Sequence, residues 1–103
     1  MRDLFVCLAG KNRSPLAVEI AKRLAFEKRI KGYEATSLGI AYAKTNSFEG
    51  YDRIFVMNSV IRKEMIDKYK VSSCIIDLDV QDAPINKGYI LISELEEKLK
   101  PFF

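Results

Sequence analysis

Short apolar runs alternate with amphipathic segments along this chain of 103 residues, and this alternation constrains its fold more than any other feature. Apolar runs of four to seven residues are typical of buried strands, and apolar residues at helical spacing indicate helices. The expected strands are 4–7, 33–38, 53–57 and 72–78, and the expected helices are 15–30, one capped by Asn58 or Ser59, and about 89–100. The pattern predicts one α/β domain over residues 1–103, an open, doubly wound, mostly parallel four-stranded sheet with helices on both faces.

The first expected helix carries recognisable signals at both ends. Ser14 is a preferred N-cap residue, and Pro15 suits the first helical position. Gly32 follows the last apolar residue of the segment and is the expected terminator. The helix therefore begins directly after a loop that follows the first strand.

That loop has the composition of an anion site. None of its residues is proline, so every backbone N–H is kept, and Gly10 can adopt the positive φ that a curled loop often needs. The helix end would direct its free N–H groups at a bound anion, and the Arg13 fork would hold two phosphate oxygens. The expected phosphate-binding residues are Leu8, Ala9, Gly10, Lys11, Asn12, Arg13 and Ser14.

Cys7 stands at the end of the first strand, directly before this loop. A lone cysteine there is usually a small buried apolar residue. Here the helix end and Arg13 would also favour the thiolate, which is the nucleophilic form. Ser14 would donate a hydrogen bond to the sulfur when it becomes a leaving group. The order of strand, cysteine, glycine loop, Arg-Ser-Pro and helix therefore predicts a nucleophile that attacks phosphate.

The composition excludes several other chemistries. The chain has no histidine, which removes Ser-His and Cys-His mechanisms, and its two cysteines lack the spacing of a zinc site. We expect no metal and no cofactor. The net charge is only +3, with no long basic run, and no apolar stretch reaches the length of a membrane span.

These features predict a cytoplasmic protein without a nucleic-acid or membrane partner, because no apolar signal region precedes the first strand. A modest basic cluster is interpreted as a solvated face near the end of the first helix. It consists of Lys22, Arg23, Lys28, Arg29 and Lys31.

The sequence over 5–15 resembles the signature of the low-molecular-weight protein tyrosine phosphatases, in which a cysteine and five residues precede Arg-Ser-Pro. Looser likeness extends to 36–39 and 51–57, and the likeness is greatest to a short prokaryotic branch of predicted protein tyrosine phosphatases. The resemblance implies hydrolysis of a phosphotyrosine protein or a small aryl phosphate through a phosphocysteine on Cys7. It also implies inhibition by phosphate-like oxyanions.

The general acid is expected in the loop after the fourth strand. Strand ends of a parallel sheet share one edge, so this loop opens beside Cys7. The resemblance implies an aspartate there, followed by proline and an aromatic residue. Asp82 is the first choice, although Ala83 separates it from the proline and the aromatic residue is missing. Asp79 is the second choice, and Asp77 belongs to the strand.

The segment 41–50 shows no sustained period and is expected to be a loop with one helical turn. The resemblance implies that this region helps to form the wall of the substrate cleft. Tyr42 and Phe48 are therefore candidates to line a pocket for an aromatic ring, and packing onto the core is an equal alternative for each.

Three alternative functions use the same loop. A thiol-dependent arsenate reductase would need resolving thiols, and only Cys74 is available, which is expected to be buried in the fourth strand. A phosphocysteine carrier would be similar in size. The resemblance to known carriers implies a loop without the arginine that follows the cysteine and five residues, so Arg13 argues against this function. A non-catalytic phosphate-binding module is compatible with the altered acid loop.

Overall fold

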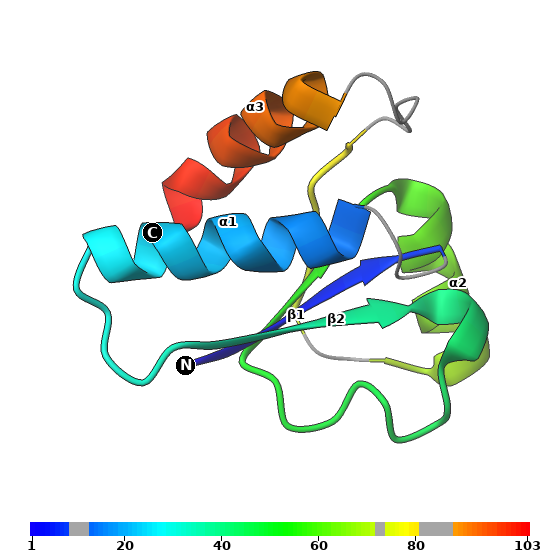
Figure 1. The fold of residues 1–103 in the computed structure, drawn as a ribbon. Helices are drawn as coiled ribbons and strands as arrows, with labels where there is room; N and C mark the ends of the chain where they lie inside the picture. Colours follow the sequence, from blue (N-terminus) through cyan, green and yellow to red (C-terminus); the bar gives the residue numbers. More distant parts are fainter. Residues whose placement is uncertain (9–12, 72–73, 81–87) are drawn as a thin grey trace.

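The structure, a computed structural model, describes residues 1–8, 13–71, 74–80 and 88–103 (Figure 1). No helix among these residues is long and apolar enough to cross a membrane. In chain order, the elements are β1 (Arg2–Cys7), α1 (Arg13–Glu27), β2 (Glu34–Gly39), the 3-10 helix η1 (Ile40–Tyr42), β3 (Arg53–Val56), α2 (Ser59–Tyr69), β4 (Ile75–Asp77), α3 (Gly88–Leu99) and the 3-10 helix η3 (Lys100–Phe102).

The four strands form one parallel sheet in the order β2-β1-β3-β4. The connections from β1 to β2 and from β3 to β4 run in opposite directions. Right-handed crossovers therefore place α1 and α2 on opposite faces of the sheet, with α3 packed beside α1 (Figure 1). The predicted fold class is confirmed, and β1 and β3 meet where the order reverses, which is where such sheets bind ligands.

The core lies on both faces of the sheet, against α1 and α3 on one and α2 on the other, and its centre is the pair β1 and β3. Phe5 and Phe55 are fully buried and stack with ring centroids 4.8 Å apart. The inner face of α1 contributes Ala17, Ala21 and Leu24 to the same core. Burial of these two strands on both faces explains why their sequences are continuous apolar runs.

Both expected ends of the first helix are wrong by a few residues. The helix begins at Arg13, so Ser14 lies inside its first turn and is not the N-cap. At the other end, Arg29 takes the left-handed conformation with φ 56°, and the Ile30 N–H donates to the Ala25 carbonyl at 2.9 Å. This is a Schellman motif, which ends the helix before Gly32 is reached.

The second helix begins as its sequence indicates. Asn58 is the N-cap, and its Oδ1 accepts a hydrogen bond from the Ile61 N–H at 3.0 Å. The helix ends at Tyr69, and its C-cap Lys70 is left-handed with φ 55°. Both helix ends that close in the left-handed conformation therefore use long basic residues where glycine would be less strained.

A buried ion pair fixes the amino edge of the sheet. Asp3 is fully buried, and its carboxylate receives Arg53 Nε at 2.9 Å and Nη2 at 2.7 Å. The Tyr33 hydroxyl donates to the same carboxylate at 2.7 Å, and burial together with this bond raises the pKa of Tyr33. Arg53 also donates to the Phe102 carbonyl at 2.9 Å, so the cluster ties the carboxyl-terminal residues to the sheet.

We expect Lys70→Gly to raise the free energy of unfolding by about 0.5–1 kcal/mol, because glycine relieves the left-handed strain at the end of α2. Lys63→Gly in the middle of the same helix is the matched control, and it should lower stability by about 1 kcal/mol. Urea unfolding measures both. Destabilisation by both substitutions would contradict the conformation assigned to Lys70.

Candidate active site

Cys7 is the last residue of β1 and is 3% exposed. Its Sγ lies 3.0 Å from the hydroxyl oxygen of Ser14, which is fully buried in the first turn of α1. The predicted contact between this hydroxyl and the sulfur is present, although Ser14 has lost its expected role as N-cap. Because the start of the helix sets the position of Ser14, the β1–α1 junction supplies the sulfur with a hydroxyl that can donate to it.

Arg13 is the first residue of α1 and is 8% exposed, an unusual position for a guanidinium. Its Nη1 donates to the backbone carbonyl of Val80 at 3.1 Å. Val80 follows β4, so this one hydrogen bond joins the cysteine loop to the segment that leads to the expected acid. The described residues contain only three buried polar or charged side chains, and two of them, Arg13 and Ser14, lie at this junction.

The chain leaves β4 through a tight turn at the same edge of the sheet. The Asp77 carboxylate accepts the Asp79 N–H at 2.8 Å, and Asp79 is left-handed with φ 50°. The Val80 N–H then donates to the Met57 carbonyl at the end of β3. Asp77 belongs to β4, as predicted, although the strand ends there and not at Leu78, and both aspartates are exposed. The turn thus carries the chain from β4 back across β3 toward Arg13.

Lys98 holds this turn from outside the sheet, a role that the sequence did not indicate. It lies on α3, where its Nζ donates to the Asp79 carbonyl and pairs with Glu94 at 3.1 Å. Nineteen residues separate Lys98 from Asp79 in the chain, and no local motif relates them. Only the packing of α3 beside the sheet brings them together.

The remaining predicted residues divide between described and undescribed parts of the chain. Leu8 is exposed, and its carbonyl accepts the Ala41 N–H of η1 at 3.1 Å. The other predicted loop residues and the preferred acid lie outside the described residues, so their expected roles stay predictions. These are Ala9, Gly10, Lys11, Asn12 and Asp82.

The two aromatic candidates for the cleft wall have different surroundings. Phe48 is 5% exposed and packs edge-on against Tyr69 at 5.2 Å, so it belongs to the core. Tyr42 is 67% exposed and ends η1, the element that contacts Leu8 through Ala41. Of the two candidates, Tyr42 is therefore the exposed one, and it follows the residue that contacts Leu8.

The expected burial of Cys74 in the fourth strand is wrong. Cys74 is exposed and precedes β4, level with Arg53 and Asp3 in the strand register. Four residues separate this level from Cys7, or about 13 Å along the strands. Disulfide formation needs Cα atoms within about 7 Å, so Cys74 does not serve as a resolving thiol in this fold.

The described residues contain no group of three or more histidine, cysteine, aspartate or glutamate side chains that could hold a metal ion. The β1–α1 junction instead carries groups suited to an oxyanion: the Arg13 guanidinium, the Ser14 hydroxyl and the amino end of α1. The arrangement can bind a tetrahedral anion beside a sulfur nucleophile.

Solved structures share this architecture, although no protein-family model and no curated protein matches the sequence. The YwlE arginine phosphatase from Geobacillus stearothermophilus aligns with 98% of this chain and 89% of its own, at a TM-score of 0.81 and 18% identity. The low-molecular-weight protein tyrosine phosphatase from T. tengcongensis aligns with 100% of this chain and 99% of its own, at a TM-score of 0.83 and 20% identity.

A third similar structure is a mutant of YwlE arginine phosphatase with a phosphorylated active-site serine. It covers 99% of this chain and 93% of its own, with a TM-score of 0.83 and 15% identity. The chain therefore has the fold of the low-molecular-weight protein tyrosine phosphatases, as its sequence predicted. At these identities the likeness shows the fold, and the chemistry has to be argued from the site.

We expect Arg13→Lys to weaken the binding of inorganic phosphate by about 10- to 100-fold, because lysine keeps the charge but loses the planar fork. Isothermal titration calorimetry on the reduced protein measures this change. Arg23→Lys, on the exposed side of α1, is the matched control and should bind phosphate like the wild type. Equal affinities in all three proteins would exclude Arg13 from the anion site.

Proposed function

We propose that this protein is a cysteine-dependent phosphatase that hydrolyses phosphotyrosine in proteins through a phosphocysteine on Cys7. The observation that carries the proposal is the contact of 3.0 Å between Cys7 Sγ and the Ser14 hydroxyl, beside buried Arg13. A sulfur that only fills the core needs neither a buried hydroxyl nor a buried guanidinium next to it. A sulfur that accepts and releases a phosphoryl group needs both.

In the first step, the Cys7 thiolate attacks phosphorus, and the bond between phosphorus and the phenolic oxygen breaks. Arg13 and the N–H groups of residues 8–13 hold the phosphate oxygens, on which negative charge is distributed in the transition state. Asp82 gives its proton to the departing phenolic oxygen, with Asp79 as the alternative acid. Such proton transfer typically accelerates a reaction by about 100- to 10,000-fold.

In the second step, the Asp82 carboxylate takes a proton from water, whose oxygen attacks phosphorus. The bond between sulfur and phosphorus breaks, and its electron pair returns to Cys7. The Ser14 hydroxyl stabilises the released thiolate through the contact described above. Inorganic phosphate leaves, and the enzyme returns to its starting state without a metal or a cofactor. Phosphate-like oxyanions should inhibit by occupying the same loop.

Phosphoarginine is a second candidate substrate, because similar structures include arginine phosphatases. The two substrates differ at the leaving group, which is a phenolic oxygen in phosphotyrosine and a guanidinium nitrogen in phosphoarginine. Tyr42, which is exposed and follows the residue that contacts Leu8, favours the aromatic substrate because its ring can stack on tyrosine. A cytoplasmic location remains a prediction from the sequence.

The other thiol chemistries fit these residues less well. The position of Cys74 removes the resolving thiol that an arsenate reductase would need. The buried guanidinium of Arg13 argues against a carrier, whose phosphocysteine has to persist until a partner protein discharges it. A non-catalytic phosphate-binding module would bind oxyanions at the same place without turnover.

Hydrolysis of an aryl phosphate between about pH 5 and 7, with chelator present, tests the proposal. Cys7→Ala should abolish turnover, and Cys74→Ala, the matched control, should keep it. Asp82→Asn should lower kcat by about 100- to 10,000-fold. Asp79→Asn tests the alternative acid in the same assay. A large loss only in Asp79→Asn would move the acid to Asp79.

Two results of the same experiment would contradict the proposal. Turnover that survives Cys7→Ala would exclude the thiol mechanism. Absence of turnover in folded, reduced wild type that still binds vanadate would leave a carrier or a binding module. Parallel assays on phosphotyrosine and phosphoarginine peptides decide between the two substrates.

A further inference from the structure

The far end of α1 combines exposed apolar and basic side chains. Phe26 is 84% exposed, the highest value among the large apolar side chains that the structure describes. The eleven residues 22–32 carry five basic side chains and one acidic one, although the whole chain has a net charge of only +3. The rest of the molecule is therefore slightly acidic, and the positive charge is concentrated at this end.

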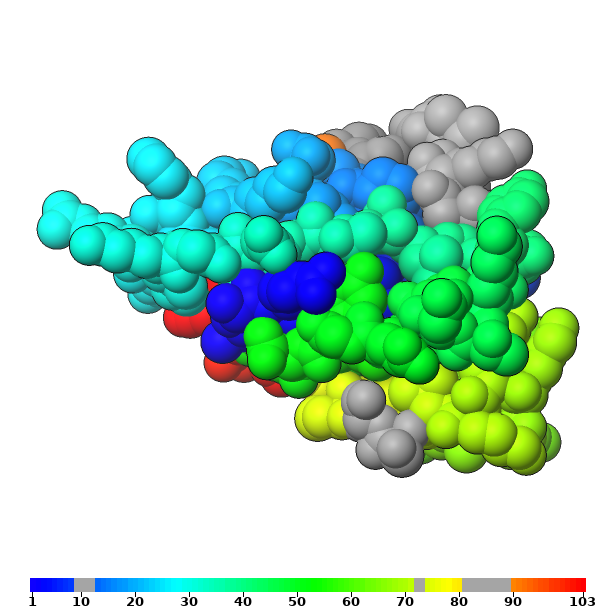
Figure 2. Space-filling view, turned by 90° about the horizontal axis from the view of Figure 1, so that it is seen from below, coloured from blue at the N-terminus to red at the C-terminus, as the bar shows by residue number. Residues whose placement is uncertain are grey.

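The structure changes the interpretation of these cations as charges on a helix face. Because α1 ends at Glu27, Lys28, Arg29 and Lys31 lie beyond the helix on the connection to β2. Figure 2 shows this segment, in cyan, projecting from one edge of the molecule. Among the described residues, neither these three cations nor Lys22 forms an ion pair, whereas Glu27 pairs with Arg23 at 3.6 Å.

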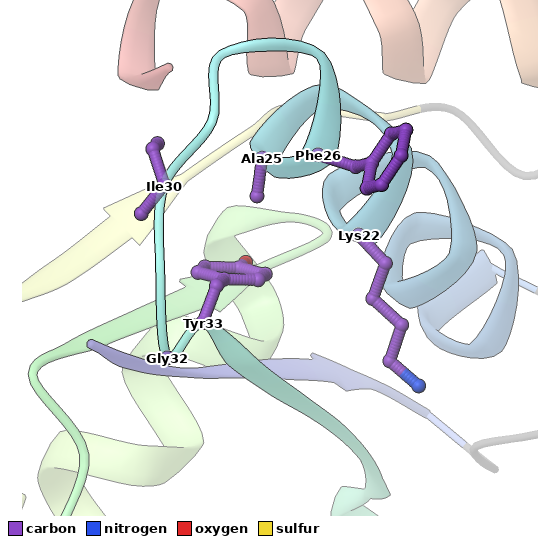
Figure 3. A pocket seen from close by; sticks show the side chains of 6 residues that line it. All are labelled: Lys22, Ala25, Phe26, Ile30, Gly32 and Tyr33. Carbon is purple, nitrogen blue, oxygen red and sulfur yellow. The ribbon is translucent and has the colours of Figure 1, made fainter.

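A hollow of about 260 Å³ lies among these residues (Figure 3). The Tyr33 ring lies beneath Ala25 (Figure 3). Phe26 and Lys22 stand along one side of the hollow, and Ile30 stands on the other. The hydroxyl of Tyr33 is held by Asp3 at 2.7 Å, so the ring is a fixed part of the lining. Ligand pockets usually span about 300–1,000 Å³, so this hollow suits one apolar side chain better than a whole small ligand.

We propose that this surface docks an acidic segment of the protein substrate that inserts one apolar or aromatic side chain. The hollow would receive the side chain, and Lys22, Lys28, Arg29 and Lys31 would attract the flanking carboxylates. A concave apolar lining with a basic rim fits a protruding side chain, whereas a lipid surface presents none. The proposal rests on the proposed function and adds a recognition element to it.

The position of the surface sets the spacing in the substrate. Phe26 on this surface lies twelve residues along α1 from Ser14, which contacts Cys7, and this corresponds to about 18 Å of helix. An extended chain covers roughly 3.3 Å per residue, so about six residues or more must separate the docking segment from the phosphotyrosine. Small aryl phosphates would not reach the surface at all.

Binding is tested without turnover, by fluorescence anisotropy of a labelled peptide that carries one phenylalanine between glutamates. We expect Phe26→Ala to weaken binding at least fivefold, and Lys28→Glu combined with Lys31→Glu to weaken it further at low salt. Val60→Ala, another exposed apolar site on α2, and Lys63→Glu are matched controls that should bind like the wild type.

Turnover tests the link to the active site. With a substrate that joins this peptide to phosphotyrosine through a long flexible spacer, Phe26→Ala should raise KM and leave kcat unchanged. All variants should hydrolyse a small aryl phosphate equally, so a failure of the phosphatase proposal would be seen separately in that assay. Equal peptide affinity in wild type and Phe26→Ala would overturn docking, and so would binding to phosphatidylserine vesicles but not to the peptide.

Discussion

The hydrogen bond from Arg13 to the Val80 carbonyl is the interaction on which the candidate site depends. It joins the start of α1 to the chain that leaves β4, two segments that are 67 residues apart in sequence. A buried guanidinium is costly unless its donors are satisfied, so the position of the β4 turn and the position of Arg13 constrain each other. The start of α1 and the segment that follows β4 are thereby joined at the carboxyl edge of the sheet.

The two edges of the sheet carry different clusters of buried polar side chains. At the carboxyl edge, the Cys7 sulfur contacts the Ser14 hydroxyl, and the neighbouring Arg13 is almost as deeply buried. At the amino edge, the buried pair of Asp3 and Arg53 fixes the sheet and orients Tyr33 under the basic surface. The helix α1 connects these edges, so recognition of a protein substrate and chemistry on its phosphate would occur at opposite ends of one helix.

Much of this arrangement could be predicted because its signals are local. The Asn58 cap and the order of strands and helices follow from short-range patterns, and the cysteine loop is a continuous motif. Ser14 shows the limit, since its hydroxyl was correctly expected at the sulfur and wrongly expected as the helix cap. The exact start of a helix depends on how the preceding loop packs, which a sequence pattern does not report.

Contacts between residues far apart in the chain could not be predicted from the sequence. Nothing near Lys98 indicates that it reaches the Asp79 carbonyl, because α3 has to pack beside the sheet before the two groups meet. Cys74 resembled a strand residue by its apolar neighbours, yet β4 begins one residue later and leaves it exposed. The end of α1 before Arg29 was missed for a local reason. An arginine in the left-handed conformation has no sequence signature comparable to that of a glycine.

The most direct test of the account is to find the phosphoryl group on the enzyme. Wild type and Ser14→Ala are quenched in acid during steady turnover of an aryl phosphate, and the modified residue is located by mass spectrometry. The account predicts a phosphoryl group on Cys7, present in a larger fraction of Ser14→Ala because the departing thiolate has lost its hydrogen-bond donor. Steady turnover with no phosphoryl group on Cys7 in either protein would contradict it.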